Sequence, residues 1–174
     1  MSNNKNLIPI NKRTTEEQRK IAQKGGIASG KVRREKRKFK KILNDSKDKN
    51  KIFTNNAEYF YYIEKQYNIN GVFVAAVGIH ESAWGTSKIA LQKNNLFGYG
   101  AYNFSNYSES IDLISRVFVK YYINPKGTSI YGGEKAVGTY YNGSNLSGIN
   151  KKYASDSNWA NAVYSHMQYL YNKL

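Results

Sequence analysis

The 174-residue sequence contains no cysteine, only two prolines and only two histidines. Without cysteine it has neither a disulfide framework nor a thiolate metal site. His80 and His166 are far apart in the sequence and match no metal-ligand spacing, so we expect no metal and no other cofactor. No uncharged apolar stretch approaches the length of a membrane span.

A secretory signal is also missing from the sequence. The first ten residues are polar and lack the apolar stretch that such a signal requires. We therefore expect the chain to be made in the cytoplasm. If its target lies outside a cell, another component must deliver it.

Acidic residues are scarce and unevenly placed. The chain has 27 Lys and Arg against 12 Asp and Glu, a net charge of +15. Residues 1–51 hold 17 of these basic residues and 5 acids, whereas residues 52–174 hold 10 and 7, together with both tryptophans and all 16 tyrosines. This asymmetry predicts a basic N-terminal extension with its linker, residues 1–51, followed by one aromatic-rich domain, residues 52–174.

The extension is predicted to be partly helical. Residues 1–13 are expected to be disordered, and residues 44–50 to form a polar linker. Between them, Thr14 or Thr15 is followed three residues later by an acid or an amide. This capping-box pattern predicts a helix that begins at Thr14 or Thr15. The adjacent Gly25-Gly26 is expected to interrupt this helix, because glycine is a poor helix former.

The domain is predicted to be mainly α-helical. Apolar periodicity and capping residues predict helices over residues 57–67, 72–83, 87–91 and 108–122, near 133–140, and from 158 onward. Asn70 and Ser108 are the expected caps of two of them. Residues 94–107, rich in Asn, Gly and Tyr, are expected to form a loop or a short hairpin.

A single acid, Glu81, lies in an apolar helical run that ends at Trp84-Gly85. An apolar wall keeps a carboxyl group protonated and able to donate a proton. Aromatic and amide side chains follow, suited to stacking on sugar rings and pairing with hydroxyl and acetamido groups: Asn94, Asn95, Phe97, Tyr99, Tyr102, Phe104 and Tyr107. The pattern favours a saccharide cleft, against a partly exposed Glu beside ordinary core and turn residues. The neighbouring His80 points about 100° away on a helix, which favours a structural role.

Several motifs occur in a fixed order across the domain. They are HESAWGTSKIA at residues 80–90, KNNLFGYGAY at 93–102, YSESI at 107–111, YNGS at 141–144 with Leu146, and Asn150 followed by YASD at 153–156 and Trp159-Ala160. Together they resemble the family 73 glycoside hydrolases, the endo-β-N-acetylglucosaminidases of bacterial autolysins and phage lysins. The resemblance covers roughly residues 57–172.

This resemblance implies a lysozyme-like helical fold with a small, reduced second lobe. It also implies cleavage of the β-1,4 bond that follows N-acetylglucosamine in peptidoglycan. Glu81 matches the catalytic acid of the family, and Tyr153 matches a tyrosine that lines the cleft and supports catalysis. The residues expected to bind substrate are Trp84, Asn94, Asn95, Phe97, Tyr99, Tyr102, Asp156 and Trp159.

A second catalytic carboxylate is harder to assign. The nearest acid after the aromatic loop is Glu109, which begins a helix, where acids commonly complement the helix dipole. Asp156 is also placed to act as a helix N-cap. Two routes stay open: Glu81 acts alone with assistance from the 2-acetamido group of the substrate, or a distant acid holds the attacking water.

The basic extension has two candidate partners, anionic wall polymers and nucleic acid, both of which carry phosphate charge. We expect a peptidoglycan hydrolase of phage or prophage origin that reaches the wall by holin-type release or as a virion component. The competing interpretation is a virion protein whose lysozyme-like domain binds glycan or nucleic acid without cleaving it. Nothing in the sequence sets an oligomeric state.

Overall fold

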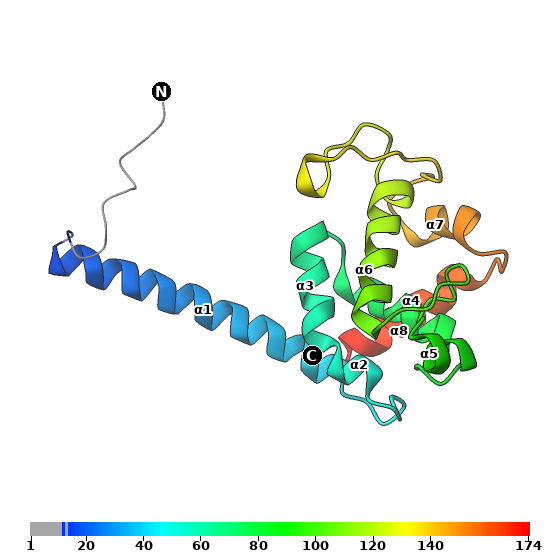
Figure 1. The fold of residues 1–174 in the computed structure, drawn as a ribbon, viewed down its shortest axis with the longest axis horizontal. Coiled ribbons are helices and arrows are strands. Elements are labelled where there is room, and N and C mark those ends of the chain that lie inside the picture. Colours follow the sequence, from blue (N-terminus) through cyan, green and yellow to red (C-terminus); the bar gives the residue numbers. More distant parts are fainter. Residues whose placement is uncertain (1–11, 13) are drawn as a thin grey trace. The chain divides into compact units, whose positions relative to one another are not determined.

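A computed structural model describes residue 12 and residues 14–174 (Figure 1). The disorder predicted for residues 1–13 thus falls, apart from Lys12, outside the described residues. The chain divides into two compact units, Met1–Arg37 and Lys38–Leu174. The predicted boundary between residues 51 and 52 lies inside the second unit. The described residues are mainly helical, as predicted, and contain one isolated β-bridge, between Ser129 and Lys135, but no β-strand.

Helix α1 (Thr15–Leu43) runs without a break over 29 residues. The predicted interruption at Gly25-Gly26 is wrong. Two glycines cost about 1 kcal/mol each relative to alanine, a penalty that a helix of this length can absorb. The predicted capping box is confirmed, because the Thr14 amide donates to Glu17 Oε2 at 2.9 Å and the Glu17 amide donates to Thr14 Oγ1 at 3.3 Å.

The last turn of α1 belongs to the second unit. Phe39, Ile42 and Leu43 are buried there and pack into its hydrophobic core. Gly71 approaches this turn and α3 so closely that a Cβ would meet the carbonyl oxygen of Phe60 at 2.5 Å. The end of the predicted extension is therefore part of the core.

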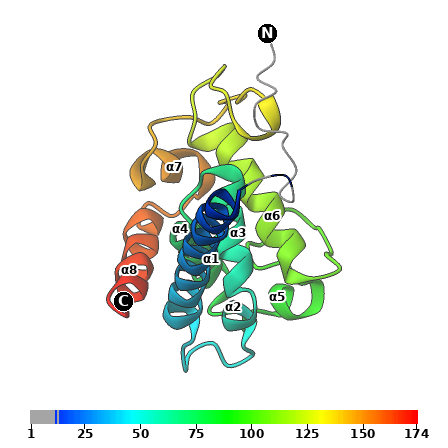
Figure 2. The same cartoon turned by 90° about the vertical axis from the view of Figure 1, so that its left-hand side faces the viewer.

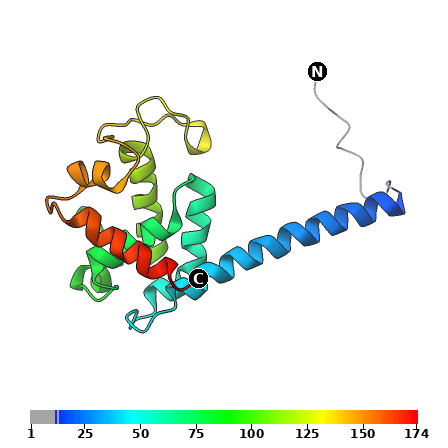
Figure 3. The same cartoon turned by 180° about the vertical axis from the view of Figure 1, so that it is seen from behind.

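Two of the residues 44–50, which are predicted to form a polar linker, are buried, and the other five are exposed. Asp45 and Asp48 are buried. Asp45 Oδ2 accepts hydrogen bonds from Lys173 Nζ at 2.5 Å and from the Tyr169 hydroxyl at 2.7 Å. Asp48 Oδ2 accepts two bonds from Thr54, both at 2.8 Å. The bonds of Asp45 tie the start of the second unit to its C-terminal end, which lies beside it in Figure 3.

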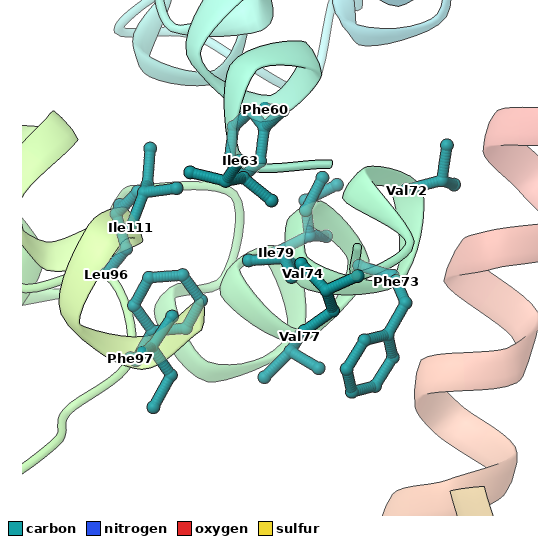
Figure 4. Close-up of a cluster of buried hydrophobic side chains, with 14 of the residues drawn as sticks. Phe60, Ile63, Val72, Phe73, Val74, Val77, Ile79, Leu96, Phe97 and Ile111 are labelled. Carbon is teal, nitrogen blue, oxygen red and sulfur yellow. The ribbon is translucent and has the colours of Figure 1, made fainter. Parts of the chain in front are cut away.

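The core is built around one central helix. Most of the core residues beyond α1 come from α2 (Ile52–Asn55), α3 (Ala57–Tyr67), α4 (Gly71–Ser82), α6 (Tyr107–Val117) and α8 (Trp159–Tyr171). Helix α4 is buried from Gly71 to Ile79 and packs against α3, α6 and α8 (Figure 2). In Figure 4, Phe60 and Ile63 of α3 lie over α4, with Leu96 and Phe97 beside Ile111 of α6.

Both ends of α4 are fixed by local hydrogen bonds. Asn70 is the N-cap, as predicted, and accepts a bond from the Phe73 amide at 3.0 Å. At the other end Ala83, Trp84 and Gly85 all have positive φ angles, of 49°, 60° and 72°. The hydroxyl of Ser82 accepts a bond from the Gly85 amide at 2.8 Å. The chain thus turns sharply one residue after Glu81.

Helix α5 (Lys88–Lys93), whose N-cap is Ser87, precedes residues 94–106, which are called the aromatic loop here. Residues 94–106 form a loop without strands. Helix α6 then begins at Tyr107 with Asn106, not the predicted Ser108, as its cap. It continues directly into a π-helix, η3 (Phe118–Tyr122). Such wider turns often occur at functional sites.

The small second lobe is irregular. A helix near residues 133–140 was expected, but this region holds only a 3-10 turn, η4 (Tyr131–Gly133). Helix α7 (Leu146–Tyr153) was not predicted. It is capped by Asn145, which accepts a bond from the Gly148 amide at 2.8 Å. Sequence periodicity does not reveal such a short helix with a glycine near its start.

Candidate active site

A cleft of about 450 Å³ opens at the C-terminal end of α4. Its lining comes from α4, the aromatic loop, η3, and the segment that joins α7 to α8: His80, Glu81, Phe97, Gly98, Tyr99, Gly100, Tyr122, Tyr153, Ala154, Ser155, Asp156 and Trp159. Six predicted site residues therefore lie together although they are widely separated in sequence. They are Glu81, Phe97, Tyr99, Tyr153, Asp156 and Trp159.

Glu81 occupies the last turn of α4 and is held by one bond from across the cleft. The indole Nε1 of Trp159 donates to Glu81 Oε1 at 2.8 Å. Trp159 is almost fully buried, so its ring is a rigid donor. The carboxylate itself is exposed, and the apolar wall predicted around it is wrong. The apolar residues of α4 face the core, whereas Glu81 faces the opening.

Tyr153 lies next to Trp159 within a cluster of aromatic rings. Its ring centroid is 5.1 Å from that of Trp159, 4.9 Å from Phe118 and 5.6 Å from Tyr122. The π-helix η3 supplies both of the latter rings. Burial, with the nearby negative charge of Glu81, raises the pKa of the Tyr153 phenol well above its usual range. Tyr153 therefore keeps its proton and can donate a hydrogen bond into the cleft.

Asn150 fixes the segment between Tyr153 and Trp159. Its buried side-chain amide donates to the carbonyl of Asp156 at 2.8 Å and accepts from the Ala160 amide at 3.2 Å. A single side chain thus links the end of α7 to the start of α8. In the sequence, Asn150 stands out only as part of a motif, and its positioning role depends on contacts that periodicity cannot reveal.

Asp156 is exposed at the rim of the cleft. Its Oδ1 accepts a bond from the Asn158 amide at 2.8 Å. The residue directly before α8 is Asn158, whose side chain makes no capping bond, so the bond to Asp156 is the capping interaction at this helix start. Among the residues that line the cleft, Glu81 and Asp156 are the two acids.

The aromatic loop is braced by two amides that do not themselves line the cleft. Asn95 is buried, accepts a bond from the Phe97 amide, and donates to the carbonyls of Tyr99 at 3.3 Å and Tyr102 at 3.2 Å. Asn94 donates to the carbonyl of Phe104 at 2.9 Å. Both residues, expected to bind substrate, instead hold the shape of the loop. Phe97 and Tyr99 are the aromatic residues that it presents to the cleft.

The structure does not bring Trp84 to the cleft. The left-handed turn after Glu81 directs its ring toward Phe53, at 5.9 Å between centroids, and Tyr169, at 6.1 Å. Lys47 Nζ lies 6.0 Å from the same ring. A helical spacing of three residues from Glu81 was therefore misleading, because α4 ends between the two positions.

Glu109 also lies apart from Glu81. It sits in the first turn of α6, where its carboxylate accepts bonds from the Ser105 amide at 2.9 Å and from Asn106 Nδ2 at 3.4 Å. It lines a second groove of about 540 Å³ together with Tyr59 and Asp112. Its geometry is that of a helix-capping acid.

The two histidines, distant in sequence, are neighbours in space. Their ring centroids are 6.0 Å apart, and His80 lines the cleft, which its helical direction did not suggest. Burial, with the charges of His80 and Lys47, lowers the pKa of His166. Within residues 12 and 14–174, no three His, Asp or Glu side chains gather in a possible metal site.

Across the same described residues, none of the helices combines the length and the apolarity needed to cross a membrane.

Comparison with known proteins agrees with this site. Residues 57–172 match the family profile Glucosaminidase, described as mannosyl-glycoprotein endo-beta-N-acetylglucosaminidase. Proteins from two strains of Streptococcus pneumoniae, both with the provisional name endo-beta-N-acetylglucosaminidase, are 33% identical over 129 residues. The match covers 72% of this chain but only 18% and 17% of theirs, so the chain spans less than a fifth of their length. The chain belongs to the glucosaminidase family of glycoside hydrolases.

Proposed function

We propose that the chain hydrolyses the β-1,4 bond that follows N-acetylglucosamine in the glycan strands of peptidoglycan. The observation that carries this proposal is the Glu81 carboxylate, held by Trp159 at 2.8 Å inside an aromatic cleft. Planar rings suit the faces of sugars, and a carboxyl group at the opening can reach a glycosidic oxygen. The names of the pneumococcal relatives support the same bond type.

Glu81 acts as the general acid in this proposal. It protonates the leaving-group oxygen as the glycosidic bond breaks and an oxocarbenium-like centre forms. The Trp159 N–H fixes one carboxylate oxygen, so that the other faces the cleft. Because both groups sit on packed helices, the proton is delivered from a defined direction.

Tyr153 supports the reaction as a neutral hydroxyl group. Its raised pKa keeps it protonated at neutral pH. Its hydroxyl donates a hydrogen bond either to the substrate acetamido group or to the attacking water. A neutral donor can stabilise charge that develops in the transition state without introducing a charge of its own.

Two routes complete the reaction. In one, the 2-acetamido oxygen of the substrate attacks the anomeric carbon as the glycosidic bond breaks, and water then opens the resulting oxazoline, so that no second carboxylate is needed. In the other, Asp156 holds the attacking water on the opposite side of the sugar. Asp156 is the acid suited to this, because it shares the cleft with Glu81 while Glu109 does not. Proton NMR of the first-formed product separates them: retained configuration indicates acetamido assistance, and inversion indicates the water.

Digestion of purified peptidoglycan by the wild type and by Glu81→Gln tests the function. The wild type is expected to release fragments with N-acetylglucosamine at the reducing end, and the variant to release almost none. Mass spectrometry identifies the sugar. Reducing-end N-acetylmuramic acid would mean a muramidase, and equal digestion by both proteins would remove Glu81 from the mechanism. The competing non-catalytic glycan-binding function predicts no release by either protein.

The basic unit is proposed to hold the enzyme near polyanions of the wall. Residues 15–37 carry eight Lys and Arg against three Glu on an exposed helix. Polymers such as teichoic acids would supply the phosphate charge. Retention by such polymers is expected to fall steeply as salt rises. Delivery by phage lysis or as a virion component is part of this proposal.

A further inference from the structure

A row of aromatic rings leads out of the cleft and across the aromatic loop. Tyr99 lines the cleft, and its ring is stacked on that of Tyr102, with centroids 6.3 Å apart and an interplanar angle of 15°. Tyr102 in turn lies 6.0 Å from Phe104. Phe104 lines the second groove, the one that also contains Tyr59. Tyr102 therefore connects the two depressions.

Tyr102 has a fixed backbone and an open side chain. Its carbonyl accepts a bond from the buried Asn95, yet the residue is 55% exposed. Its ring lies against Gly100, where a Cβ would come within 2.9 Å of Tyr102 Cε2. A tyrosine that buries so little surface contributes little to the core. Its position on a braced loop is better explained by a ligand that stacks on it.

The second groove is lined by rings and polar groups. Tyr59 and Phe104 supply the rings, and Asn106 and Ser108 supply an amide and a hydroxyl group, which also bond to Glu109 and to Asn56. Arg116 is neutralised there by its ion pair with Asp112, Nε to Oδ2 at 2.8 Å. With two carboxylates and one paired guanidinium, the groove does not favour phosphate, so a nucleic-acid strand stacked on the same rings is disfavoured.

We propose that Tyr99, Tyr102 and Phe104 form a track that carries a glycan strand from the Glu81 cleft into the groove beside Tyr59. This inference rests on the proposed function, because it concerns the same substrate. It adds a requirement for length: a strand long enough to span the loop gains contacts that a short fragment cannot reach. The track contributes binding and not chemistry.

Steady-state kinetics on two substrates test the track, a peptidoglycan tetrasaccharide and long peptide-free glycan strands. For Tyr102→Ala, KM on long strands is expected to rise about tenfold, equivalent to about 1.4 kcal/mol and within the range for one aromatic contact. The rise on the tetrasaccharide is expected to be clearly smaller, with kcat on long strands changed little. Tyr102→Phe keeps the ring and should restore the KM.

Tyr164→Ala is the matched control. Tyr164 is 53% exposed, nearly as much as Tyr102, but lies on α8 outside both depressions. Its replacement should leave both KM values unchanged. Titration of long strands into Glu81→Gln, with and without Tyr102→Ala, measures binding in the absence of turnover and is expected to show the same loss.

Three outcomes would overturn the track. An unchanged KM on long strands for Tyr102→Ala would do so, as would an equal rise on both substrates, which would place Tyr102 within the cleft. Tighter binding of single-stranded DNA than of glycan by this surface would assign the rings to nucleic acid. Failure of the proposed function gives a different result: the wild type would then cleave neither substrate, or would release fragments with N-acetylmuramic acid at the reducing end.

Discussion

At the scale of single residues, the proposed chemistry depends on the bond between Trp159 and Glu81. Trp159→Phe keeps a buried ring but removes the N–H that donates to Glu81 Oε1. Loss of a hydrogen bond to a charged group costs about 1.5–3 kcal/mol. We therefore expect kcat/KM on peptidoglycan fragments to fall about tenfold to a hundredfold. Steady-state kinetics measure the fall, and circular dichroism checks that the variant is folded.

Trp84→Phe is the natural control, because Trp84 is the other tryptophan of the chain and lies outside the cleft. Its activity should stay close to that of the wild type. If Trp84→Phe lost as much activity as Trp159→Phe, the assignment of the cleft would be contradicted.

A second residue-scale prediction concerns acid stability. Burial alone would raise the pKa of Asp45, but bonds from Lys173, the Lys47 amide and Tyr169 outweigh it and lower the pKa from 3.8 to about 2. Because the folded-state pKa is the lower one, Asp45 stabilises the fold above about pH 4, and this contribution is lost as the pH falls toward 2. It amounts to about 2 kcal/mol.

Denaturant unfolding between pH 2 and pH 7 measures this contribution. The stability of the wild type should decline below about pH 4, whereas Asp45→Asn should start lower and decline less over that interval. Parallel curves for the two proteins would show that Asp45 is not the group responsible.

The sequence predicts that both Glu81 and Trp84 lie at the cleft, but the structure places only Glu81 there. Both inferences assumed that a helical spacing continues past Glu81. It holds for the apolar residues before Glu81, but α4 ends at Ser82 and the left-handed turn sends Trp84 the other way. The Trp159 bond could not be predicted, because it joins residues 78 positions apart.

At the scale of elements, the turn after α4 sets the direction in which Glu81 faces. Gly85 has a φ of 72°, and a Cβ there would lie 2.8 Å from Ile52 Cδ1. Gly85→Ala should therefore cost both left-handed strain, about 1 kcal/mol, and a displaced Ile52. Gly127 has a φ of 87° and open space around its Cβ position, so Gly127→Ala should cost only the left-handed strain.

Thermal unfolding of Gly85→Ala and Gly127→Ala compares the two costs. The Gly85 variant is expected to lose more stability and also some activity, since the turn adjoins the helix end that carries Glu81. An equal loss in both variants would mean that Ile52 adapts freely to the added methyl group.

Elements with local signals were predicted well, and those stabilised by distant contacts were not. Asn70 and the Thr14 capping box are visible within four residues of sequence, and both are confirmed. Helix α7 was missed although Asn145 caps it locally; it is short, has a glycine in its first turn, and is also held by Asn150, which bonds to the chain beyond it. Helix α1 shows the opposite error. Glycine disfavours a helix locally, but the helix continues through Gly25-Gly26.

At the scale of the whole molecule, the boundary between the units can be tested by truncation. A chain that lacks residues 1–37 retains the complete second unit and should keep its melting temperature and its hydrolysis of soluble fragments. A chain that lacks residues 1–51 also loses Phe39, Ile42 and Leu43. Each buried apolar side chain is worth about 1.5–3 kcal/mol, so this loss is comparable with the total stability of a domain.

Differential scanning calorimetry of the two truncated chains measures the difference. The chain that lacks residues 1–37 is expected to unfold cooperatively, and the shorter chain, which lacks residues 1–51, is not. If the shorter chain were equally stable, the packing of residues 38–51 would be dispensable and the boundary near residue 52 would be right after all.

The π-helix at η3 has a consequence for how this protein can vary. Its turn holds one more residue than an α-helical turn would, and two of its rings, Phe118 and Tyr122, pack against Tyr153. Removing one residue would restore a regular helix but rotate everything after it by about 100°. Tyr122 would then leave the cleft. An exchange that keeps an aromatic ring at position 122 leaves this geometry intact, whereas a change in chain length at this point does not.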